Sequence, residues 1–303
     1  MPKLLKQAIV TPVPKKSNVS EFSYFRPISN LPFLSKLMER IVVNQLTEYC
    51  ELNSLEEPNQ SAYRQGHSTE TALLKITNDL LLKMDNQQVS LLILLDMSAA
   101  FDTIPHQLFL DRLQETFGLS GSALQWFRSY FKARAQRIAI NGEMSTTDEL
   151  EIGLPQGSGA GPFGYKTYTK PIGYIIKMLA YHINYNMFAD DNQLHNALSP
   201  NSVSSQLTAK ANLEYCITVL SKWLHENKLK LNGNKTELIM IGKKSQLSKM
   251  SFDSISIAGS EIQAKPFAKN LGVYIDQDLS MTVQVNHVIK TCNTQLRILW
   301  FCG

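Results

Sequence analysis

An apolar run at residues 89–95, interrupted only by Ser90 and closed by Asp96, constrains the fold of this chain more than any other sequence feature. The run is too short to cross a bilayer, which takes about 20 apolar residues. Its length and polar boundaries are typical of a strand that is buried on both faces. We therefore expect a well-covered sheet, with the Asp96 carboxylate placed where a buried strand ends.

The remaining sequence predicts short helices and strands that alternate without a regular βαβ rhythm, which favours the α+β class. With 44% hydrophobic and 18% charged residues in 303, the chain can build a sizeable core, and disorder or a coiled coil is excluded. Apolar periodicity predicts helices at residues 30–49, 68–84, 106–117, 121–132, 165–178, 203–227 and 282–299, the second of them capped by Ser68 or Thr69. Strands are expected at residues 134–140, 150–154, 183–189, 236–241, 253–258 and 267–275, with a proline-punctuated edge strand at 7–14. The first two of these strands would be joined through a hairpin turn at Asn141-Gly142.

The charge is unevenly distributed along the chain. Residues 1–50 carry a net +4, residues 51–219 a net −5 and residues 220–303 a net +5. This order fits a chain whose ends hold a polyanion while a central acidic site holds cations, although ordinary solvated surface gives the same pattern.

Nothing in the sequence predicts export or a membrane span. No apolar signal core follows the first charged residues, and no apolar run is long enough for a spanning helix. The four cysteines form no CxxC pair, which favours reduced thiols. We expect an intracellular protein that does not contact membranes, in the nucleus or the cytoplasm.

Two acidic features carry the chemistry. Asp96 ends the buried strand, and Asp190-Asp191 lie at the tip of a predicted hairpin. Three carboxylates brought together repel one another and require a cation, and hard oxygen ligands suit Mg²⁺ or Mn²⁺. The alternatives are a strand-end turn or helix cap at Asp96 and a solvated turn at Asp190-Asp191, because the sequence alone does not bring the two features together.

Eight short segments occur in a recognisable order. They are 24–31 (YFRPISNL), 62–69 (AYRQGHST), 95–102 (LDMSAAFD), 126–130 (WFRSY), 154–158 (LPQGS), 188–191 (FADD), 229–237 (LKLNGNKTE) and 270–273 (NLGV). This order resembles the reverse transcriptase domain of non-LTR (LINE-type) retrotransposons. The resemblance covers roughly residues 7–300.

The resemblance implies a right-hand polymerase fold with a reverse transcriptase domain at residues 1–276. Fingers would come mainly from 1–88 and the palm mainly from 89–276, interleaved in one chain. Residues 277–303 would begin a truncated thumb, and the endonuclease domain of the family would be absent, as in a truncated copy of an element.

By the same resemblance, Asp96, Asp190 and Asp191 are the catalytic carboxylates. Together with the Met97 carbonyl they would hold two Mg²⁺ ions, which Mn²⁺ can replace, for transfer of a nucleotide onto a primer 3′-OH. Lys235 matches a lysine near the pyrophosphate and is a candidate general acid, the alternative being a surface lysine.

The resemblance also assigns residues to the deoxynucleoside triphosphate: Lys15, Lys16, Arg26, Phe101, Gln156 and Gly157. Arg26 and the lysines would hold the triphosphate, although a solvated turn also explains the lysines. Phe101 would lie under the sugar and exclude a 2′-OH, unless it is a core aromatic. Gln156 and Gly157 would lie under the nascent base pair.

A third set is assigned to the RNA template and the DNA primer. Arg64 would lie near the template, its alternative being a structural ion pair. Asn270, Leu271 and Gly272 would form a hairpin that holds the primer, its alternative being an ordinary strand turn.

One segment departs from the family pattern. Where the family has bulky apolar residues, residues 159–164 are Gly-Ala-Gly-Pro-Phe-Gly. Each lost side chain in a packed helix costs about 2–4 kcal/mol, so we expect reduced stability here.

The sequence thus predicts an RNA-directed DNA polymerase domain. The first alternative is a catalytically inactive remnant that only binds RNA, and the second is another palm-fold nucleotidyl transferase or cyclase.

Overall fold

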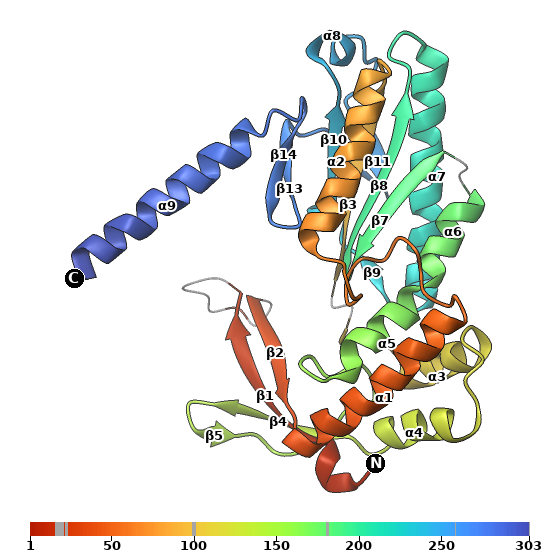
Figure 1. Ribbon diagram of the computed structural model, residues 1–303, viewed down its shortest axis with the longest axis vertical. Coiled ribbons are helices and arrows are strands. Elements are labelled where there is room, and N and C mark those ends of the chain that lie inside the picture. The colour runs from red at the N-terminus through yellow and green to blue at the C-terminus, as the bar shows by residue number, and fades with distance from the viewer. Residues whose placement is uncertain (16–20, 22–23, 99–100, 180–181, 258, 303) are drawn as a thin grey trace. The chain divides into compact units, whose positions relative to one another are not determined.

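The computed structural model describes residues 1–303 except 16–20, 22–23, 99–100, 180–181, 258 and 303 (Figure 1). The described chain divides into two compact units built from interleaved segments. Unit 1 consists of Met1–Pro58, Ser98–Pro171 and Leu224–Lys230. Unit 2 consists of Asn59–Met97, Ile172–Trp223 and Leu231–Gly303.

The longer helices lie close to their predicted positions. They are α1 (Phe33–Leu52), α2 (Thr69–Asp85), α3 (His106–Glu115), α4 (Gly121–Phe131), α5 (Ala160–Thr169), α6 (Pro171–Leu179), α7 (Val203–Glu226) and α9 (Thr282–Cys302). Short helical segments are η1 (Lys3–Lys6), η3 (Gly233–Lys235) and α8 (Lys244–Leu247). In the described part of the chain, no helix is both long enough and apolar enough to span a membrane.

The strands contain several elements that the sequence did not predict, among them β2 and β12. The first seven are β1 (Gln7–Pro14), β2 (Phe25–Asn30), β3 (Val89–Ser98), β4 (Ala135–Ile140), β5 (Glu143–Met144), β6 (Asp148–Glu149) and β7 (Ile183–Phe188). The others are β8 (Asp191–Leu198), β9 (Lys230–Leu231), β10 (Glu237–Ile241), β11 (Ser254–Ile257), β12 (Ser260–Gln263), β13 (Phe267–Asn270) and β14 (Val273–Asp276).

In unit 1, the predicted edge strand at residues 7–14 is an internal strand. The sheet has the order β2-β1-β4-β5, in which β1 pairs antiparallel with β2 and parallel with β4. Pairing with β4 ends at Val10, whereas pairing with β2 continues to Pro14. The prolines therefore lie where the strand has one neighbour and the missing N–H breaks no second ladder, which explains the wrong prediction.

The hairpin predicted at Asn141-Gly142 is confirmed, but its return strand is not the one expected. Both turn residues have positive φ, 51° and 87°, as a two-residue hairpin turn requires. Beyond the turn the chain forms β5 and β6, and not a strand at residues 150–154. The return strand against the start of β4 is β6, which pairs with Ala135 and Gln136, and the Leu150 N–H just beyond it donates to the Arg134 carbonyl at 2.8 Å.

The glycine-rich segment forms the first turns of α5, which begins five residues earlier than predicted and ends before Pro171. A Cβ on Gly164 would lie 2.9 Å from Leu154 Cδ1, and one on Gly161 would lie 2.9 Å from Ser158 Oγ. Neighbouring atoms therefore pack closely against both glycines and leave no room for larger side chains. Leu154 and Ser158 therefore occupy the space beside Gly164 and Gly161, and the reduced stability expected at residues 159–164 stays a prediction.

Helix α1 exposes part of the apolar stripe whose periodicity predicted it. Leu34, Leu37 and Ile41 are each more than 40% exposed. The helix buries Glu39 instead. Its carboxylate accepts the Gly159 N–H at 2.6 Å and the Ala160 N–H at 3.3 Å, and so caps α5.

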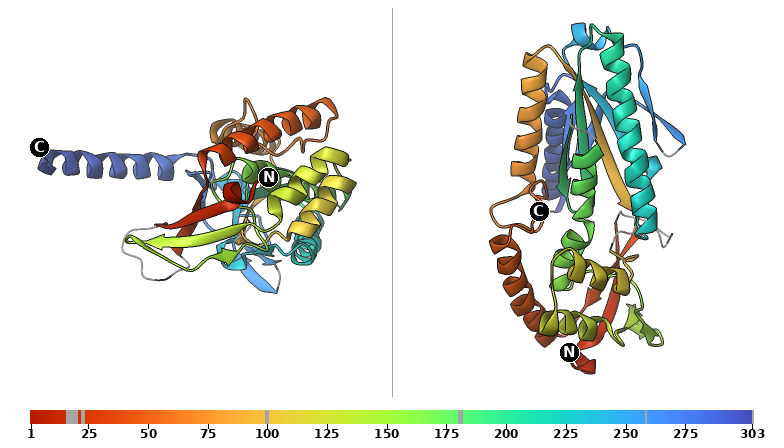
Figure 2. Two further views of the ribbon diagram at one scale, coloured as in Figure 1. Left: turned by 90° about the horizontal axis from the view of Figure 1, so that it is seen from below. Right: turned by 90° about the vertical axis from the view of Figure 1, so that its right-hand side faces the viewer.

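Unit 2 is built on a four-stranded run in the order β10-β3-β8-β7, with antiparallel pairing throughout. Val89, Leu91, Leu92 and Ile93 of β3 have no exposed surface, so the apolar run is the buried strand that the sequence predicted. Helices α2 and α7 lie on opposite faces of this sheet (Figure 2). Ser68 caps α2 through a capping box with Thr71, also as predicted.

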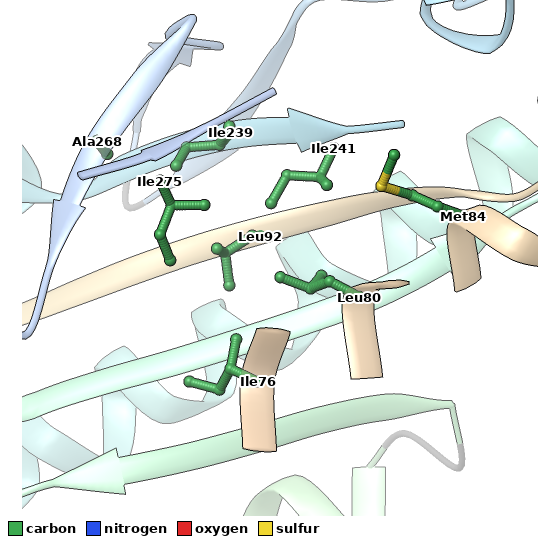
Figure 3. Close-up of a cluster of buried hydrophobic side chains, with 8 residues drawn as sticks. All are labelled: Ile76, Leu80, Met84, Leu92, Ile239, Ile241, Ala268 and Ile275. Atoms are coloured by element: carbon green, nitrogen blue, oxygen red, sulfur yellow. The ribbon is translucent and has the colours of Figure 1, made fainter. Parts of the chain in front are cut away.

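The face covered by α2 also packs against the β13–β14 hairpin. The cluster joins the helix, the sheet and the hairpin through eight buried side chains: Ile76, Leu80, Met84, Leu92, Ile239, Ile241, Ala268 and Ile275 (Figure 3). The hairpin is therefore fixed to the same face of the sheet as α2.

Candidate active site

The tip of the β7–β8 hairpin presents two carboxylates, as predicted. Phe188 pairs with Asp191, which leaves Ala189 and Asp190 as the turn. Ala189 has φ 56°, a left-handed conformation that a residue with a Cβ seldom adopts. The buried Gln60 stabilises it, because its Oε1 accepts the N–H groups of both Ala189 and Ala62, at 3.2 and 3.0 Å.

Strand register brings Asp96 to this hairpin. Asp96 of β3 pairs directly with Asp191 of β8, so their side chains lie on the same face of the sheet. On the other side of β3, Glu237 of β10 pairs with Leu94. Because the strands are antiparallel, Lys235, two residues before Glu237, comes close to Asp96. Lys235 Nζ lies 3.4 Å from Asp96 Oδ2. The structure therefore joins two acidic features that are 94 positions apart in the sequence.

Each carboxylate makes the ionised form of its neighbours less favourable. Asp191 keeps contact with solvent, but the protein around its carboxyl, followed by the charges of Asp190 and Asp96, raises its pKa to about 6. Lys235 opposes this shift and lowers the pKa. Tyr63 also lies in this field, since burial and the Asp190 charge raise its pKa. The site thus favours a positive charge beyond that of Lys235.

The donor set fits hard divalent cations, although the side chains do not converge on one point. Within the described residues, no three His, Cys, Asp or Glu side chains gather as a ready-made metal site. Asp96 Oδ2 is nevertheless buried without a hydrogen bond, and its neighbours are a carboxylate and the Lys235 ammonium. Carboxylate oxygens of this kind are the preferred ligands of Mg²⁺ and Mn²⁺.

The segment predicted to hold the primer forms a tight hairpin turn in the same unit. Asn270 pairs with Val273, and Leu271 and Gly272 have φ values of 46° and 92°. The Asn270 side chain is buried and points to the sheet, where its Oδ1 accepts a hydrogen bond from Gln193 Nε2 at 2.7 Å. The exposed part of the turn is thus Leu271-Gly272.

Arg64 also belongs to unit 2. It follows Tyr63, whose φ is 58°, in the segment between Gln60 and α2. The Arg64 carbonyl accepts the His67 N–H at 3.2 Å, and its side chain is half-buried. Its role at the template stays a prediction.

Unit 1 carries the residues predicted for the nucleotide. The Phe101 ring stacks on Tyr165 with centroids 4.6 Å apart, and its carbonyl accepts the Leu154 N–H at 2.7 Å. Gln156 Nε2 donates to both carboxylate oxygens of Asp102, at 2.9 and 3.0 Å. Both contacts hold the loop after Leu154 in a defined shape.

Gly157 has φ 103°, and a Cβ there would lie 3.0 Å from the Ser29 carbonyl of β2. Only glycine suits this position, as the family pattern requires. Lys15 and Arg26 lie on the exposed part of the β1–β2 hairpin, where Val13 pairs with Arg26. Lys16 lies outside the described residues.

Sequence reasoning missed Gln60 and Gln193. Gln60 holds the turn before Asp190, and Gln193 bonds the primer-turn residue Asn270. Each forms a hydrogen bond with a residue more than 70 positions away in the sequence, so no local periodic pattern could indicate its role. The one available signal was the position of Gln193, two residues beyond the acidic pair and in a strand.

These features define a fold class, a palm-type sheet in which an acidic hairpin lies beside a carboxylate on the neighbouring strand. The sequence matches the reverse transcriptase (RNA-dependent DNA polymerase) family over residues 13–275. The chain belongs to this family.

Curated relatives agree with this assignment. The chain is 28% identical over 306 residues to the probable RNA-directed DNA polymerase from transposon BS of Drosophila melanogaster, covering 98% of this chain. It is 23% identical to the RNA-directed DNA polymerase from mobile element jockey of the same species, covering 99% of this chain. The chain spans about a third of the length of each, 32%. The predicted resemblance to non-LTR retrotransposon reverse transcriptases is confirmed.

Solved structures confirm the predicted right-hand polymerase fold. The apo telomerase of Candida tropicalis aligns with a TM-score of 0.60 at 12% identity, over 92% of this chain and 48% of that one. A form truncated from its C-terminal domain aligns with a TM-score of 0.57 at 14% identity, over 86% of this chain and 54% of that one.

Proposed function

We propose that this chain is the catalytic domain of an RNA-directed DNA polymerase that extends a DNA primer along an RNA template with deoxynucleoside triphosphates. The observation that carries the proposal is the pairing of Asp96 with Asp191, beside Asp190 in the turn. Because the three acids come from a family-matching strand and hairpin, their arrangement supports a shared role at the reacting phosphate.

In this proposal Asp96, Asp190, Asp191 and the Met97 carbonyl hold two divalent cations, Mg²⁺ or Mn²⁺. Such ions would neutralise charge on the attacking and leaving oxygens. The carboxylates would orient the ions, and bound cations would relieve the repulsion between the carboxylates. Lys235 would donate a proton toward a leaving pyrophosphate, and its position 3.4 Å from Asp96 supports this role.

The remaining assignments concern binding. Arg26, Lys15 and Lys16 would hold the triphosphate, Phe101 would exclude a 2′-OH, and the Gln156-Gly157 loop would support the new base pair. Arg64 would contact the template and the Leu271-Gly272 turn the primer. We also propose that residues 1–88 act mainly as fingers, residues 89–276 mainly as palm, and residues 277–303 as the start of a thumb.

Primer extension tests the proposal. A poly(rA) template, an oligo(dT) primer and dTTP are supplied with Mg²⁺ or Mn²⁺, and a poly(dA) template and an unprimed reaction serve as further arms. We expect extension on poly(rA) that Asp190→Asn abolishes and Asp85→Asn, an exposed acid on α2, leaves intact. A folded protein that binds the duplex without extending it would instead support an inactive RNA-binding remnant. Incorporation without template would support a transferase.

A further inference from the structure

A row of buried amides lies directly behind the carboxylates of unit 2. Gln193 follows Asp191 by two positions on β8, so both side chains lie on one face of the sheet. Asn186 pairs with Gln193 across β7 and β8, and Leu94 pairs with it on β3. Asn270 of the β13–β14 hairpin completes the row through its hydrogen bond with Gln193.

This row is costly in free energy. Asn186, Gln193 and Asn270 are each at most 3% exposed, yet four of their six amide atoms have no hydrogen-bond partner among the described residues: Asn186 Nδ2, Asn186 Oδ1, Gln193 Oε1 and Asn270 Nδ2. Buried amides without partners destabilise a fold, whereas apolar side chains of the same shape would not. Stability therefore does not explain Gln193 and Asn270, and the one hydrogen bond that joins them points to a positioning role for this pair.

The contacts also fix the direction of the hairpin. Ala268 packs in the cluster that contains Leu92, and Asn270 bonds Gln193, which is level with Leu94. Each step of two residues moves one level along the sheet toward Asp96. The next residues of the hairpin, Leu271 and Gly272, therefore follow on the carboxylate side of this row.

We propose that the Gln193–Asn270 hydrogen bond is a positioning device that holds the Leu271-Gly272 turn at a fixed level beside Asp191, and so aligns a primer 3′ end with the carboxylates. The proposal rests on the proposed function, because it assigns the turn to the primer. Gln193 and Asn270 are positioning residues that act through the turn. A directional hydrogen bond sets one register, whereas apolar packing alone permits the hairpin to slide.

Paired leucine substitutions separate positioning from simple stability. Gln193→Leu leaves the Asn270 amide buried with no partner, so the melting temperature should fall. Gln193→Leu/Asn270→Leu removes both polar groups and should recover most of that melting temperature. We expect the KM for primer–template to stay raised about threefold to tenfold in the double variant, the range that one lost hydrogen bond implies. The KM for dTTP should change by less than about twofold.

The matched control is Asn186→Leu, which alters an equally buried amide of the same row that has no bond to the hairpin. It should leave the KM for primer–template within about twofold of wild type. A double variant that recovers both stability and primer KM would overturn the proposal. So would a control that raises primer KM as much as the double variant.

Hydrogen exchange separates this proposal from the proposed function, because it needs neither nucleic acid nor activity. In the double variant, amides of residues 270–274 should exchange faster, while those of β7 and β8 keep their wild-type rates. Unchanged exchange at residues 270–274 would refute the positioning device even in an active polymerase. Faster exchange in a protein that never extends a primer would instead count against the polymerase function alone.

Discussion

Two aspartates, one in each unit, show how the neighbouring groups determine the role of a carboxylate. The protein around the carboxyl raises the pKa of Asp102 in unit 1 and of Asp191 in unit 2, although both residues keep contact with solvent. Around Asp102, the hydrogen bond from Gln156 and the charge of Lys15 then lower the pKa. Around Asp191, the charges of Asp190 and Asp96 raise the pKa further, and Lys235 alone among the stated causes opposes them.

The difference indicates which acid is structural and which is reactive. Asp102 receives two hydrogen bonds and shapes the loop that carries Gln156. Asp191 faces like charges, an arrangement that costs stability unless a cation or a proton is bound. Such uncompensated acids are typical of functional sites. The same substitution at the two positions should therefore give different results.

Asp191→Asn should have the largest effect. It removes a carboxylate from the proposed cation site, so primer extension should fall on the order of a thousandfold or more. The free energy of unfolding at pH 7 without divalent ions should rise, because one repelling charge is gone. Extension rates and urea unfolding, compared with Asp85→Asn, check both results. An Asp191→Asn variant with wild-type extension would end the assignment of this acid to catalysis.

Lys235→Met should lower kcat by about a hundredfold, the usual range for a lost general acid. It should also raise the pKa of Asp191 further, since the charge that lowers it is removed. Single-turnover rates across pH 5–9 measure the first effect. Lys235→Arg supplies the comparison: it keeps the charge but not the proton-donating ability, so kcat should stay low while the Asp191 pKa returns toward its wild-type value.

Gly164→Ala should destabilise unit 1 by about 1–3 kcal/mol, the usual cost of overpacking. The added Cβ would meet Leu154 Cδ1 at 2.9 Å. Gly233→Ala is the control, because a Cβ at that position meets no heavy atom within 4 Å. Urea unfolding measures both. A stabilised Gly164→Ala would show that the space beside Leu154 is open, contrary to the packing described above.

The stability of the ion-free chain should depend on pH through Asp191. Its pKa is about 6 in the folded chain against an ordinary value of 3.8, so the folded state binds more protons between these values. This contribution to the free energy of unfolding is full below about pH 4 and is lost as pH rises through 6. His195, whose pKa burial lowers to about 4, acts in the opposite direction in an overlapping range.

The difference in the free energy of unfolding between wild type and Asp191→Asn isolates the contribution of Asp191, because His195 is present in both. Wild type should lose stability relative to the variant as pH rises from 4 to 7. Thermal unfolding at several pH values measures this. A difference that does not vary with pH would contradict the raised pKa.

Asp102→Asn should have the smallest effect. Asparagine keeps one oxygen that can accept the Gln156 amide, so the loop should retain its shape. We expect the KM for dTTP to rise by no more than about threefold, the range of one weakened hydrogen bond. Steady-state kinetics measure it. A loss comparable to that of Asp191→Asn would remove the contrast between the two acids.

Local signals predicted those parts of the fold that local contacts determine. The Ser68 cap, the Asn141-Gly142 turn and the buried strand before Asp96 are decided within a few residues, and all three are confirmed. The order of eight segments indicated the family that the match over residues 13–275 then showed.

The wrong predictions concern contacts between distant segments. Proline at positions 12 and 14 favoured an edge strand, but the β4 pairing that makes β1 internal ends at Val10. The sequence also could not show that Ser158 and Leu154 occupy the space beside Gly161 and Gly164. Gln193 was missed because its partner Asn270 lies 77 positions away.

The most direct test is Mn²⁺ binding to the full chain, monitored by electron paramagnetic resonance without nucleic acid at pH 7 and at lower pH. We expect wild type to bind Mn²⁺ at pH 7 and to bind it more weakly as the pH falls through 6. Asp191→Asn should lose this binding, whereas Asp102→Asn and Asp85→Asn should retain it. Equal binding by wild type and Asp191→Asn would contradict the claim that the acids on β3 and the β7–β8 hairpin form the cation site.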